Sequence, residues 1–562
     1  MLARGLTARF PRHGFGWKAL GAALGGMGHA ADAVVAMEKA ASLVPNDPEL
    51  QGDLAVVYRR AGRLRDAESA YRRLLSIRPD LAEAQNNLGN TLCDLERFDE
   101  AEAAFRAAIQ IQPGCQDAHF NLANVLRDQG RIHEAIASYR MALELAPDDL
   151  QAHSNLLLAL NYANPIDTES CRSEARRYAE AVARKTPYRF TEWACRRDPE
   201  RLRLGFVSGD LRSHPVGYLI EGLLRGLDAT RIEAIAYPTN PATDTVTNRL
   251  KNYFAAWKPI HGFGDEGAAR RIHDDGVHIL IDLTGHTAHN RLPVFALKPA
   301  PVQVSWLGYF ATTGLAEMDY VLTDPWSTPS DRKKDFTETL WQLPETRLCF
   351  APPPDEVPCS SLPPALENGY VTFGCFNNMT KINDDVIALW AHVLDAVPNS
   401  RLLLKAHQLG RASCRDRILK RFAANGISPS RLMLEGPTPH HAYLATYHRL
   451  DIALDPFPFS GGMTSIDSLW MGVPILTLQG STLVSRQGTS ILANAGLHDW
   501  IAKDKDDYIA KAIHHAKDVD RLLKLRSGMR PRLLDSPLCN TKRFASHFES
   551  AMWDMWRRHV AS

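Results

Sequence analysis

The chain has 562 residues, several times the ~100–200 residues of one ordinary domain, so about three domains are expected. Hydrophobic residues make up 45% and charged residues 23%, a globular composition that excludes a disordered chain. Lys plus Arg (65) nearly balances Asp plus Glu (64), so no overall field attracts nucleic acid or an anionic membrane. We therefore expect neither as a partner.

The cysteines and the N-terminal segment indicate the cellular compartment in which the protein resides. Nine cysteines, from Cys93 to Cys539, form no close CxxC pair, and an odd number cannot all pair within one chain. The basic start and small apolar residues of segment 1–26 are typical of a secretory signal, but a repeat pattern runs on from Trp17, so we expect no cleavage there. No run reaches the ~18 apolar residues of a membrane span. The sequence predicts a cytoplasmic protein.

Prolines recur every 34 residues in the first third of the chain, at Pro45, Pro79, Pro113 and Pro147. Each unit also carries an alanine and, four residues later, a large side chain; the alanines are Ala33, Ala67, Ala101 and Ala135, and the large residues are Met37, Tyr71, Phe105 and Tyr139. Small residues at fixed offsets let antiparallel helices approach closely, and proline ends the second helix of each pair. The pattern resembles the tetratricopeptide repeat and predicts an α superhelical domain over residues 1–162.

One repeat position lies on the first helices, which line the concave face of such a superhelix. It holds Asn87, Asn121 and Asn155, with Asp53 one unit earlier. A side-chain amide both donates and accepts hydrogen bonds. We therefore predict that this asparagine column binds the backbone of an extended protein or peptide acceptor. The alternative is that these side chains only solvate the helix face or bond neighbouring helices.

After the repeats the residue pattern of the sequence changes twice. Residues 163–200 are charged and predict a helical connector. From residue 201, short β-branched runs alternate with helical stretches, first LRLGFVSGD, EAIAYP, VHILIDLTG, PVQVSWLGY and DYVLTD, then YVTFGCF, RLLLKAH, RLMLEG, DIALDP and VPILTL. Each set predicts a doubly wound, Rossmann-like α/β lobe. A Pro-rich stretch at 351–364 divides them into an N-terminal lobe, 201–360, and a C-terminal lobe, 361–562.

Four motifs follow one another behind the repeats: VSGDLRSHPVG (207–217), WLGYFATTG (306–314), FNNMTKI (376–382) and DPFPFSGGMTSIDSLWMGVP (455–474). Together they resemble the bacterial members of the O-linked N-acetylglucosamine transferase family. The resemblance implies a two-lobed fold of GT-B type that transfers N-acetylglucosamine from UDP-GlcNAc to Ser or Thr hydroxyls of proteins, with inversion. It also implies that neither a metal nor another cofactor is needed.

Other functions stay open at this point. Related catalytic regions transfer a hexose to protein asparagine. A repeat scaffold that only binds a nucleotide, and a sugar-nucleotide epimerase on the same architecture, are further alternatives, although an epimerase has no evident use for a peptide-binding arm. The DxD sequence of Asp504 and Asp506, which metal-dependent transferases use, lies in a charged helical tract away from any strand end, so we expect no metal site.

The Gly-rich loop after DIALDP is the predicted donor site. Glycines let the backbone approach an anion, and helix N–H groups stabilise a diphosphate, which singles out Gly461, Gly462, Met463 and Thr464. Asp467, one turn into the helix expected to begin near Ser465, is placed to accept hydrogen bonds from ribose hydroxyls. The alternative is an ordinary helix capped by Thr464 or Ser465. Animal relatives have His-Thr at positions 462–463, so contacts from those side chains are lost here.

Family correspondence adds other donor-site residues. Lys381, in a loop after a predicted strand, is expected to neutralise charge on the departing β-phosphate. Asn378 matches a nucleotide-contacting glutamine, and Thr438 and His440 match positions that meet uracil, although relatives often have lysine at position 440. The positions whose backbone meets the donor sugar are Leu307 and Gly308.

Three residues are predicted to act on the acceptor proton. His214 matches the proposed base or acceptor-positioning residue of the family, and an imidazole is able to take a proton at neutral pH. The alternative is that this His-Pro pair only starts a helix. Asp275 and His278 are rival proton acceptors, and His278 equally fits a satisfied core side chain.

Overall fold

The computed structural model describes residues 2–353 and 357–561. They form two compact units, one ending at Ala152 and the other beginning at His153. The boundary falls within helix α10 (Leu150–Leu160), ten residues before the predicted end of the repeat domain. Contacts explain the difference, because His153 and Ser154 on this helix bond to Glu174 and His286 of the second unit.

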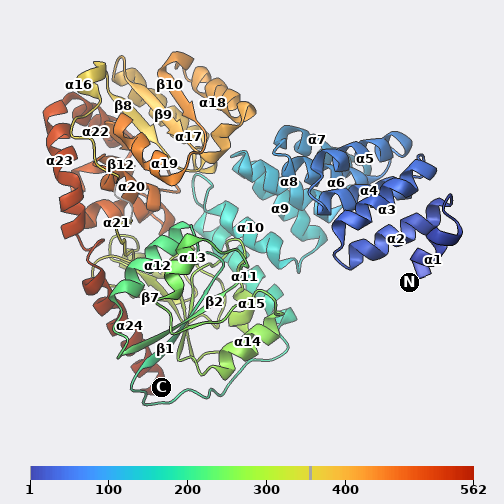
Figure 1. Cartoon of the computed structure of the whole chain (residues 1–562). Helices are drawn as coiled ribbons and strands as arrows, with labels where there is room; N and C mark the ends of the chain where they lie inside the picture. The colour runs from blue at the N-terminus through green and yellow to red at the C-terminus, as the bar shows by residue number, and fades with distance from the viewer. Residues whose placement is uncertain (1, 354–356, 562) are drawn as a thin grey trace. The chain divides into compact units, whose positions relative to one another are not determined.

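The first unit is a row of antiparallel helix pairs (Figure 1). Helix α1 (Leu2–Arg9) precedes the pairs α2 (Gly14–Gly26) with α3 (Ala30–Leu43), α4 (Pro48–Arg60) with α5 (Leu64–Ile77), α6 (Ala82–Asp94) with α7 (Phe98–Ile111), and α8 (Gln116–Asp128) with α9 (Ile132–Leu145). Each second helix ends two residues before a repeat proline, as predicted.

Close packing explains the repeat pattern. The four repeat alanines, Ala33, Ala67, Ala101 and Ala135, are completely buried, and the large residues that follow them are buried too. A Cβ built on Gly89 would lie 2.5 Å from the Phe105 ring, so a larger residue would push the two helices of that pair apart. The expected helical repeats are confirmed.

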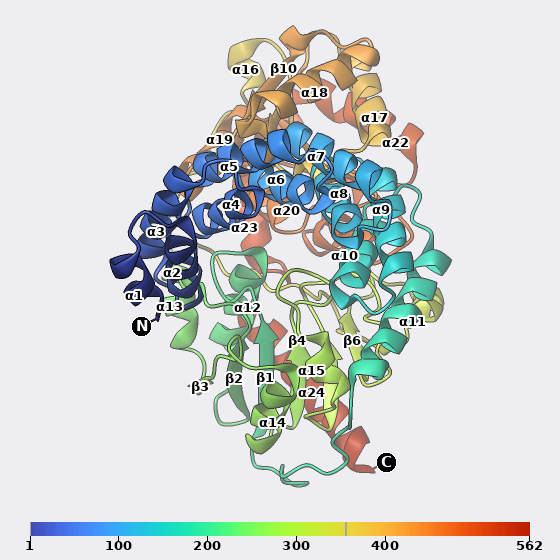
Figure 2. The ribbon, with the colours of Figure 1, turned by 90° about the vertical axis from the view of Figure 1, so that its right-hand side faces the viewer.

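The second unit opens with α10 and the connector helix α11 (Thr168–Lys185), which lead into a seven-stranded parallel sheet (Figure 2). Its strands are β1 (Leu202–Ser208), β2 (Ile232–Pro238), β3 (Ala256–Trp257), β4 (Ile279–Asp282), β5 (Val302–Ser305), β6 (Tyr320–Thr323) and β7 (Thr339–Gln342), in the order β3-β2-β1-β4-β5-β6-β7. The connecting helices are α12 (Pro215–Gly226), α13 (Thr245–Lys251), α14 (Asp265–Asp274) and α15 (Leu292–Ala296).

A six-stranded parallel sheet forms the second lobe, in the order β10-β9-β8-β11-β12-β13. Its strands are β8 (Thr372–Cys375), β9 (Arg401–Lys405), β10 (Leu432–Glu435), β11 (Ile452–Leu454), β12 (Ile475–Leu478) and β13 (Ile501–Ala502). Its helices are α16 (Ala365–Asn368), α17 (Asp384–Ala396), α18 (Ala412–Ala424), α19 (His440–Thr446), α20 (Met463–Trp470), α21 (Gln487–Asn494), α22 (Lys505–Lys517) and α23 (Val519–Asp535), and the chain ends with α24 (Thr541–Ala561). All ten predicted strands are present; β3, β7 and β13 are additional.

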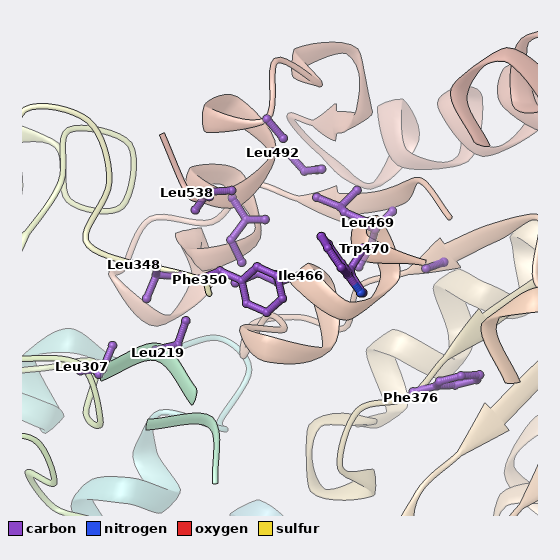
Figure 3. Close-up of a cluster of buried hydrophobic side chains, with 14 of the residues drawn as sticks. Leu219, Leu307, Leu348, Phe350, Phe376, Ile466, Leu469, Trp470, Leu492 and Leu538 are labelled. Atoms are coloured by element: carbon purple, nitrogen blue, oxygen red, sulfur yellow. The ribbon is translucent and has the colours of Figure 1, made fainter. Parts of the chain in front are cut away.

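One hydrophobic core joins the two lobes. Figure 3 shows Phe350 of the first lobe beside Ile466 of the second, and the Phe350 and Trp470 rings meet edge to face at 5.7 Å. The last helix, α24, packs on α12 of the first lobe, although its sequence lies in the range predicted for the second. Residues 354–356 of the Pro-rich boundary segment lie outside the described residues.

Within the described residues, no helix combines the length and the apolar character that a bilayer crossing requires.

Candidate functional site

The predicted donor residues of the second lobe gather where two neighbouring strands end. Lys381 follows β8, and the loop 455–462 follows β11, which pairs with β8 in parallel. Because the carboxyl ends of parallel strands lie at one edge of a sheet, this is where such lobes bind ligands.

Lys381 lies at the centre of this edge, at the end of a short 3-10 helix, η2 (Met379–Lys381). Its Nζ donates to Oδ1 of Asn377 at 3.2 Å and to the Ser460 carbonyl at 3.0 Å, and it lies 4.3 Å from the centre of the Phe459 ring. Burial lowers the pKa of Lys381 to about 8, against the attraction of the nearby Asp455 carboxylate. The ammonium is thus held by neutral partners and remains available to an anion.

Asn377 connects Lys381 to the glycine loop. Its Oδ1 also accepts the Thr464 hydroxyl at 3.0 Å, and its side chain is buried. The hydroxyl of Thr464, a residue of the predicted diphosphate site, therefore donates to Asn377 in this structure.

Asp455 holds the glycine loop in place through hydrogen bonds. Its two carboxylate oxygens accept the Gly461 N–H at 2.6 Å and the Thr477 hydroxyl at 2.7 Å, and burial raises its pKa to about 6. A Cβ on Gly461 would lie 2.3 Å from Oγ of Ser465. Gly461 is therefore needed for close packing, and its N–H is directed to Asp455 rather than outward.

Helix α20 begins at Met463, two residues earlier than predicted. Gly462 occupies the N-cap position without a side-chain bond, and its carbonyl accepts the N–H groups of Ser465 and Ile466. The alternative cap by Thr464 or Ser465 is therefore wrong, because both residues lie inside the first turn. The opening N–H groups of a helix have no intrahelical partner, so the start of α20 is suited to an anion.

Asp467 is buried one turn into α20. Its carboxylate accepts the Tyr443 hydroxyl at 3.3 Å, and burial raises its pKa to about 7. A buried carboxylate with a single long hydrogen bond keeps the acceptor capacity that two ribose hydroxyls would use.

The remaining predicted donor residues of this lobe lie at its surface. Asn378 is exposed, and its Oδ1 accepts the Thr380 N–H at 2.9 Å and the Gln408 amide at 2.6 Å. Thr438 and His440 are exposed at the start of α19. The His440 ring lies nearly parallel to that of Tyr443, at 6.1 Å, so the two form a small aromatic surface.

His214 caps α12 at the carboxyl end of β1. Its Nδ1 accepts the Val216 N–H at 3.3 Å and lies 3.7 Å from the Asp210 carboxylate, and burial lowers its pKa. While Val216 donates to Nδ1, a neutral ring carries its proton on Nε2. In that tautomer the outward edge of His214 is a donor, which favours acceptor positioning over general-base duty.

Asp275 and His278 lie at the other edge of the first sheet. His278 stands at the amino end of β4, its Nδ1 accepts the Arg203 N–H at 3.0 Å, and burial lowers its pKa to about 4. The Asp275 carboxylate accepts from Lys258 and, at 2.7 Å, from the Tyr237 hydroxyl. The structure does not bring either residue to the edge that carries His214, and we leave both out of the proposed site.

Leu307 and Gly308 form a tight turn after β5. Leu307 has a φ of +75°, and a Cβ on Gly308 would lie 1.9 Å from the Leu283 carbonyl. Only glycine fits position 308, and the turn lies just after β5, at the carboxyl edge of the first sheet.

The carboxyl edges of the two lobes face each other. The Tyr218 ring on α12 lies nearly parallel to His440 at 6.0 Å, and Phe310 meets Phe459 edge to face at 5.4 Å. Phe459 also contacts Lys381, so this ring connects Phe310 of the first lobe to the predicted leaving-group lysine.

The predicted acceptor residues divide between the two units. Asn87 on α6 and Asn121 on α8 are half-buried in the first unit, whereas Asn155 on α10 belongs to the second. The Asn121 amide donates to Oδ1 of the buried Asn86 at 3.0 Å. For Asn121, a bond between neighbouring helices is thus present, and peptide binding by the column remains a prediction.

The DxD sequence, which was set aside as a metal site, has a structural role at one of its aspartates. Asp504 caps α22 by accepting the Asp507 N–H at 2.8 Å. Throughout 2–353 and 357–561, no group of three or more His, Cys, Asp or Glu side chains is arranged to hold an ion.

Sequence reasoning missed three residues of the site: Asn377, Tyr443 and Phe459. Each acts through a partner distant in sequence, namely Thr464, Asp467 and Lys381. The only local signal was that Asn377 precedes the selected Asn378 in a loop after a strand.

Comparisons with known proteins match both parts of the chain. The model of glycosyl transferase family 41 matches residues 165–350 and 360–548, about two thirds of the chain, and tetratricopeptide-repeat models match residues 26–89 and 86–149. A solved structure of a point mutant of the Thermobaculum terrenum O-GlcNAc transferase superposes with a TM-score of 0.83 at 34% identity, covering 92% of this chain and 98% of that one.

Longer relatives are also similar. The probable UDP-N-acetylglucosamine–peptide N-acetylglucosaminyltransferase SPINDLY of Solanum lycopersicum is 38% identical over 72% of this chain, and the UDP-N-acetylglucosamine–peptide N-acetylglucosaminyltransferase of Caenorhabditis elegans is 25% identical over 67%. The matches cover 44% and 42% of those proteins, so the chain spans less than half the length of these relatives. Its fold, its motifs and these matches agree: the chain belongs to glycosyl transferase family 41.

Proposed function

We propose that this chain is a protein O-glycosyltransferase that moves N-acetylglucosamine from UDP-GlcNAc to Ser or Thr hydroxyls, with inversion and without a metal. The observation that carries the proposal is the placement of Lys381. Its ammonium, held by Asn377 and Ser460, stands beside the start of α20, where a diphosphate is stabilised. The likeness to the Thermobaculum terrenum enzyme supports the same reaction.

In this reaction the acceptor oxygen forms a bond to the sugar C1 and gives up its proton, to His214 or to the departing diphosphate, while the bond from C1 to the β-phosphate oxygen breaks and leaves its electron pair on that oxygen. Negative charge develops on the departing diphosphate, and the Lys381 ammonium neutralises it. In other transferases a divalent metal ion has this role. Asp467 accepts from the ribose, and the turn at Leu307 and Gly308 presents backbone groups to the donor sugar.

His214 is the candidate neighbour of the acceptor hydroxyl. With the ring proton on Nε2, His214 orients the hydroxyl by donating to it. To take the acceptor proton, the ring must first hold its own proton at Nδ1, where the Asp210 carboxylate lies 3.7 Å away. The same carboxylate would then stabilise the charged ring.

The repeats are proposed to hold the protein acceptor. Asn87, Asn121 and Asn155 offer amide groups at one repeat position, and amides suit an extended backbone whatever its sequence. The Asn121 bond to Asn86 leaves its carbonyl oxygen as the group for an acceptor N–H.

The proposal is tested by incubating the purified chain with a panel of UDP-sugars and a protein lysate, then measuring UDP release and acceptor masses. We expect acceptors to gain one N-acetylhexosamine, in linkage to Ser or Thr. A hexose on asparagine would instead assign the chain to protein N-glycosylation. Binding of UDP without either product would identify a nucleotide-binding scaffold.

A further inference from the structure

Helix α21 brings its first turn against the glycine loop. The Gly488 N–H donates to Oγ of Ser460 at 3.2 Å, and the carbonyl of the same serine accepts from Lys381. Gln487, the first residue of α21, places its amide beside Gly462, because a Cβ built on Gly462 would lie 3.5 Å from Oε1 of Gln487. The amide therefore stands over the side of Gly462 where another residue would carry its side chain.

The Gln487 amide is buried but unsatisfied. The residue is 3% exposed, and its Nε2 has no hydrogen-bond partner among the described residues. Ser465, completely buried in the first turn of α20, also has an Oγ without a partner there. A buried donor without a partner costs stability until a ligand or water satisfies it, and these two lie beside the one loop that is proposed to hold the diphosphate.

The surroundings select an anionic ligand. Helix α20 begins at this loop and the first turn of α21 packs against it, and a helix N-terminus attracts negative charge. The Lys381 ammonium, which donates to the Ser460 carbonyl, places a positive charge beside the same loop. Asp467, the proposed ribose acceptor, lies one turn further along α20 and contacts Tyr443. Gln487 thus lies beside Gly462 of the loop that is proposed to hold the diphosphate.

We infer that Gln487 is a donor-binding residue whose amide N–H donates to a β-phosphate oxygen of the nucleoside diphosphate. Rotation about the last side-chain torsion exchanges Oε1 and Nε2, so the donor end can face Gly462 without breaking a bond of Nε2. Because Gly462 has no side chain, the Gln487 amide would supply the polar side-chain group at this position of the loop. This inference rests on the proposed function, since it needs a UDP-sugar in the site.

The test compares the Kd values of UDP, UMP and uridine, measured by calorimetry, for the wild-type chain and two variants. Gln487→Met keeps the length of the side chain and removes the amide; we expect UDP to bind roughly tenfold to a hundredfold more weakly, the range of a hydrogen bond to a charged group, with UMP and uridine unchanged. Gln487→Glu keeps the shape and places a carboxylate against the diphosphate, so UDP binding should weaken further while UMP again changes little.

Stability gives an independent readout. Because Gln487→Met removes an unsatisfied amide, its Tm should equal or exceed that of wild type. The matched control is Gln303→Met in the first lobe, where a buried amide donates to the carbonyls of Phe295 and Glu317 at 2.9 and 2.8 Å. That variant should lose Tm and keep the wild-type ratio of UDP to UMP affinity.

The outcomes separate this inference from the proposed function. A folded Gln487→Met variant that binds UDP as wild type does overturns the inference, and so does an equal loss for UDP and UMP, which would place the contact away from the β-phosphate. Failure of the wild-type chain to bind UDP would instead overturn the proposed function.

Discussion

Lys381 and Asn377 are joined by a hydrogen bond of 3.2 Å, and the oxygen that accepts it also accepts the Thr464 hydroxyl. Asn377 is therefore a positioning residue. We expect Asn377→Ala to lower kcat about threefold to tenfold, the equivalent of one net hydrogen bond of ~0.5–1.5 kcal/mol. Asn377→Asp keeps the oxygen and adds a negative charge, which should raise the pKa of Lys381. The pH profile of kcat/KM separates the two variants, and identical profiles would limit Asn377 to packing.

Lys381 itself should act mainly on the leaving group. Lys381→Ala is expected to lower turnover several hundredfold, in line with ~2.7–4 kcal/mol for one preorganised donor, and to weaken UDP binding less. Lys505→Ala is the control, because this half-exposed lysine of the same lobe pairs with Asp385 at 3.1 Å outside the site. A folded Lys381→Ala variant with near-normal turnover would remove the residue from the mechanism.

The lowered pKa of Lys381, about 8, predicts an alkaline limit to activity. The ammonium loses its charge as pH rises through this value, so kcat/KM should fall about tenfold per pH unit above it. Unfolding does not account for this loss. The unfolded lysine titrates near 10.5, so between pH 8 and 10.5 the unfolded chain binds more protons and this group raises the free energy of unfolding with pH. Activity that stays level to pH 10 would mean that Lys381 acts uncharged.

Removal of metal should leave activity intact, because Lys381 is proposed to neutralise the diphosphate. The measurement is UDP-GlcNAc turnover after dialysis against excess EDTA, with and without added Mn²⁺ or Mg²⁺. A loss that Mn²⁺ specifically restores would direct attention back to Asp504 and Asp506.

The asparagine column predicts a defect confined to protein acceptors. Replacing Asn87, Asn121 and Asn155 together by Ala should raise the apparent KM for full-length proteins, while donor hydrolysis and transfer to short peptides stay unchanged. Each bond contributes only ~0.5–1.5 kcal/mol, so the triple variant is the informative one. Wild-type modification of full-length acceptors by the folded variant would leave the column as a helix face bonded to residues such as Asn86.

The sequence alone determined the repeats, the ten predicted strands and the glycine loop. These features are local or periodic: a proline every 34 residues, alanines at helix contacts, and β-branched runs followed by glycines. Lys381 was singled out by family correspondence in a loop after a predicted strand, and Asp467 by its place one turn into the predicted helix; their roles remain predictions. Membership of the family followed from the order of the motifs.

Tertiary structure decided the rest, because parallel sheets bring together residues that are distant in the chain. Asn377 accepts the hydroxyl of Thr464, 87 positions away, and the Gln487 amide lies beside Gly462 of the glycine loop. Register decided against Asp275 and His278: they precede β4, whereas His214 follows β1, so parallel pairing sets them at opposite edges of one sheet. The sequence specifies residue types and their spacing. Only the packed fold determines which side chains meet at the same edge of a sheet and which of their polar atoms have no hydrogen-bond partner.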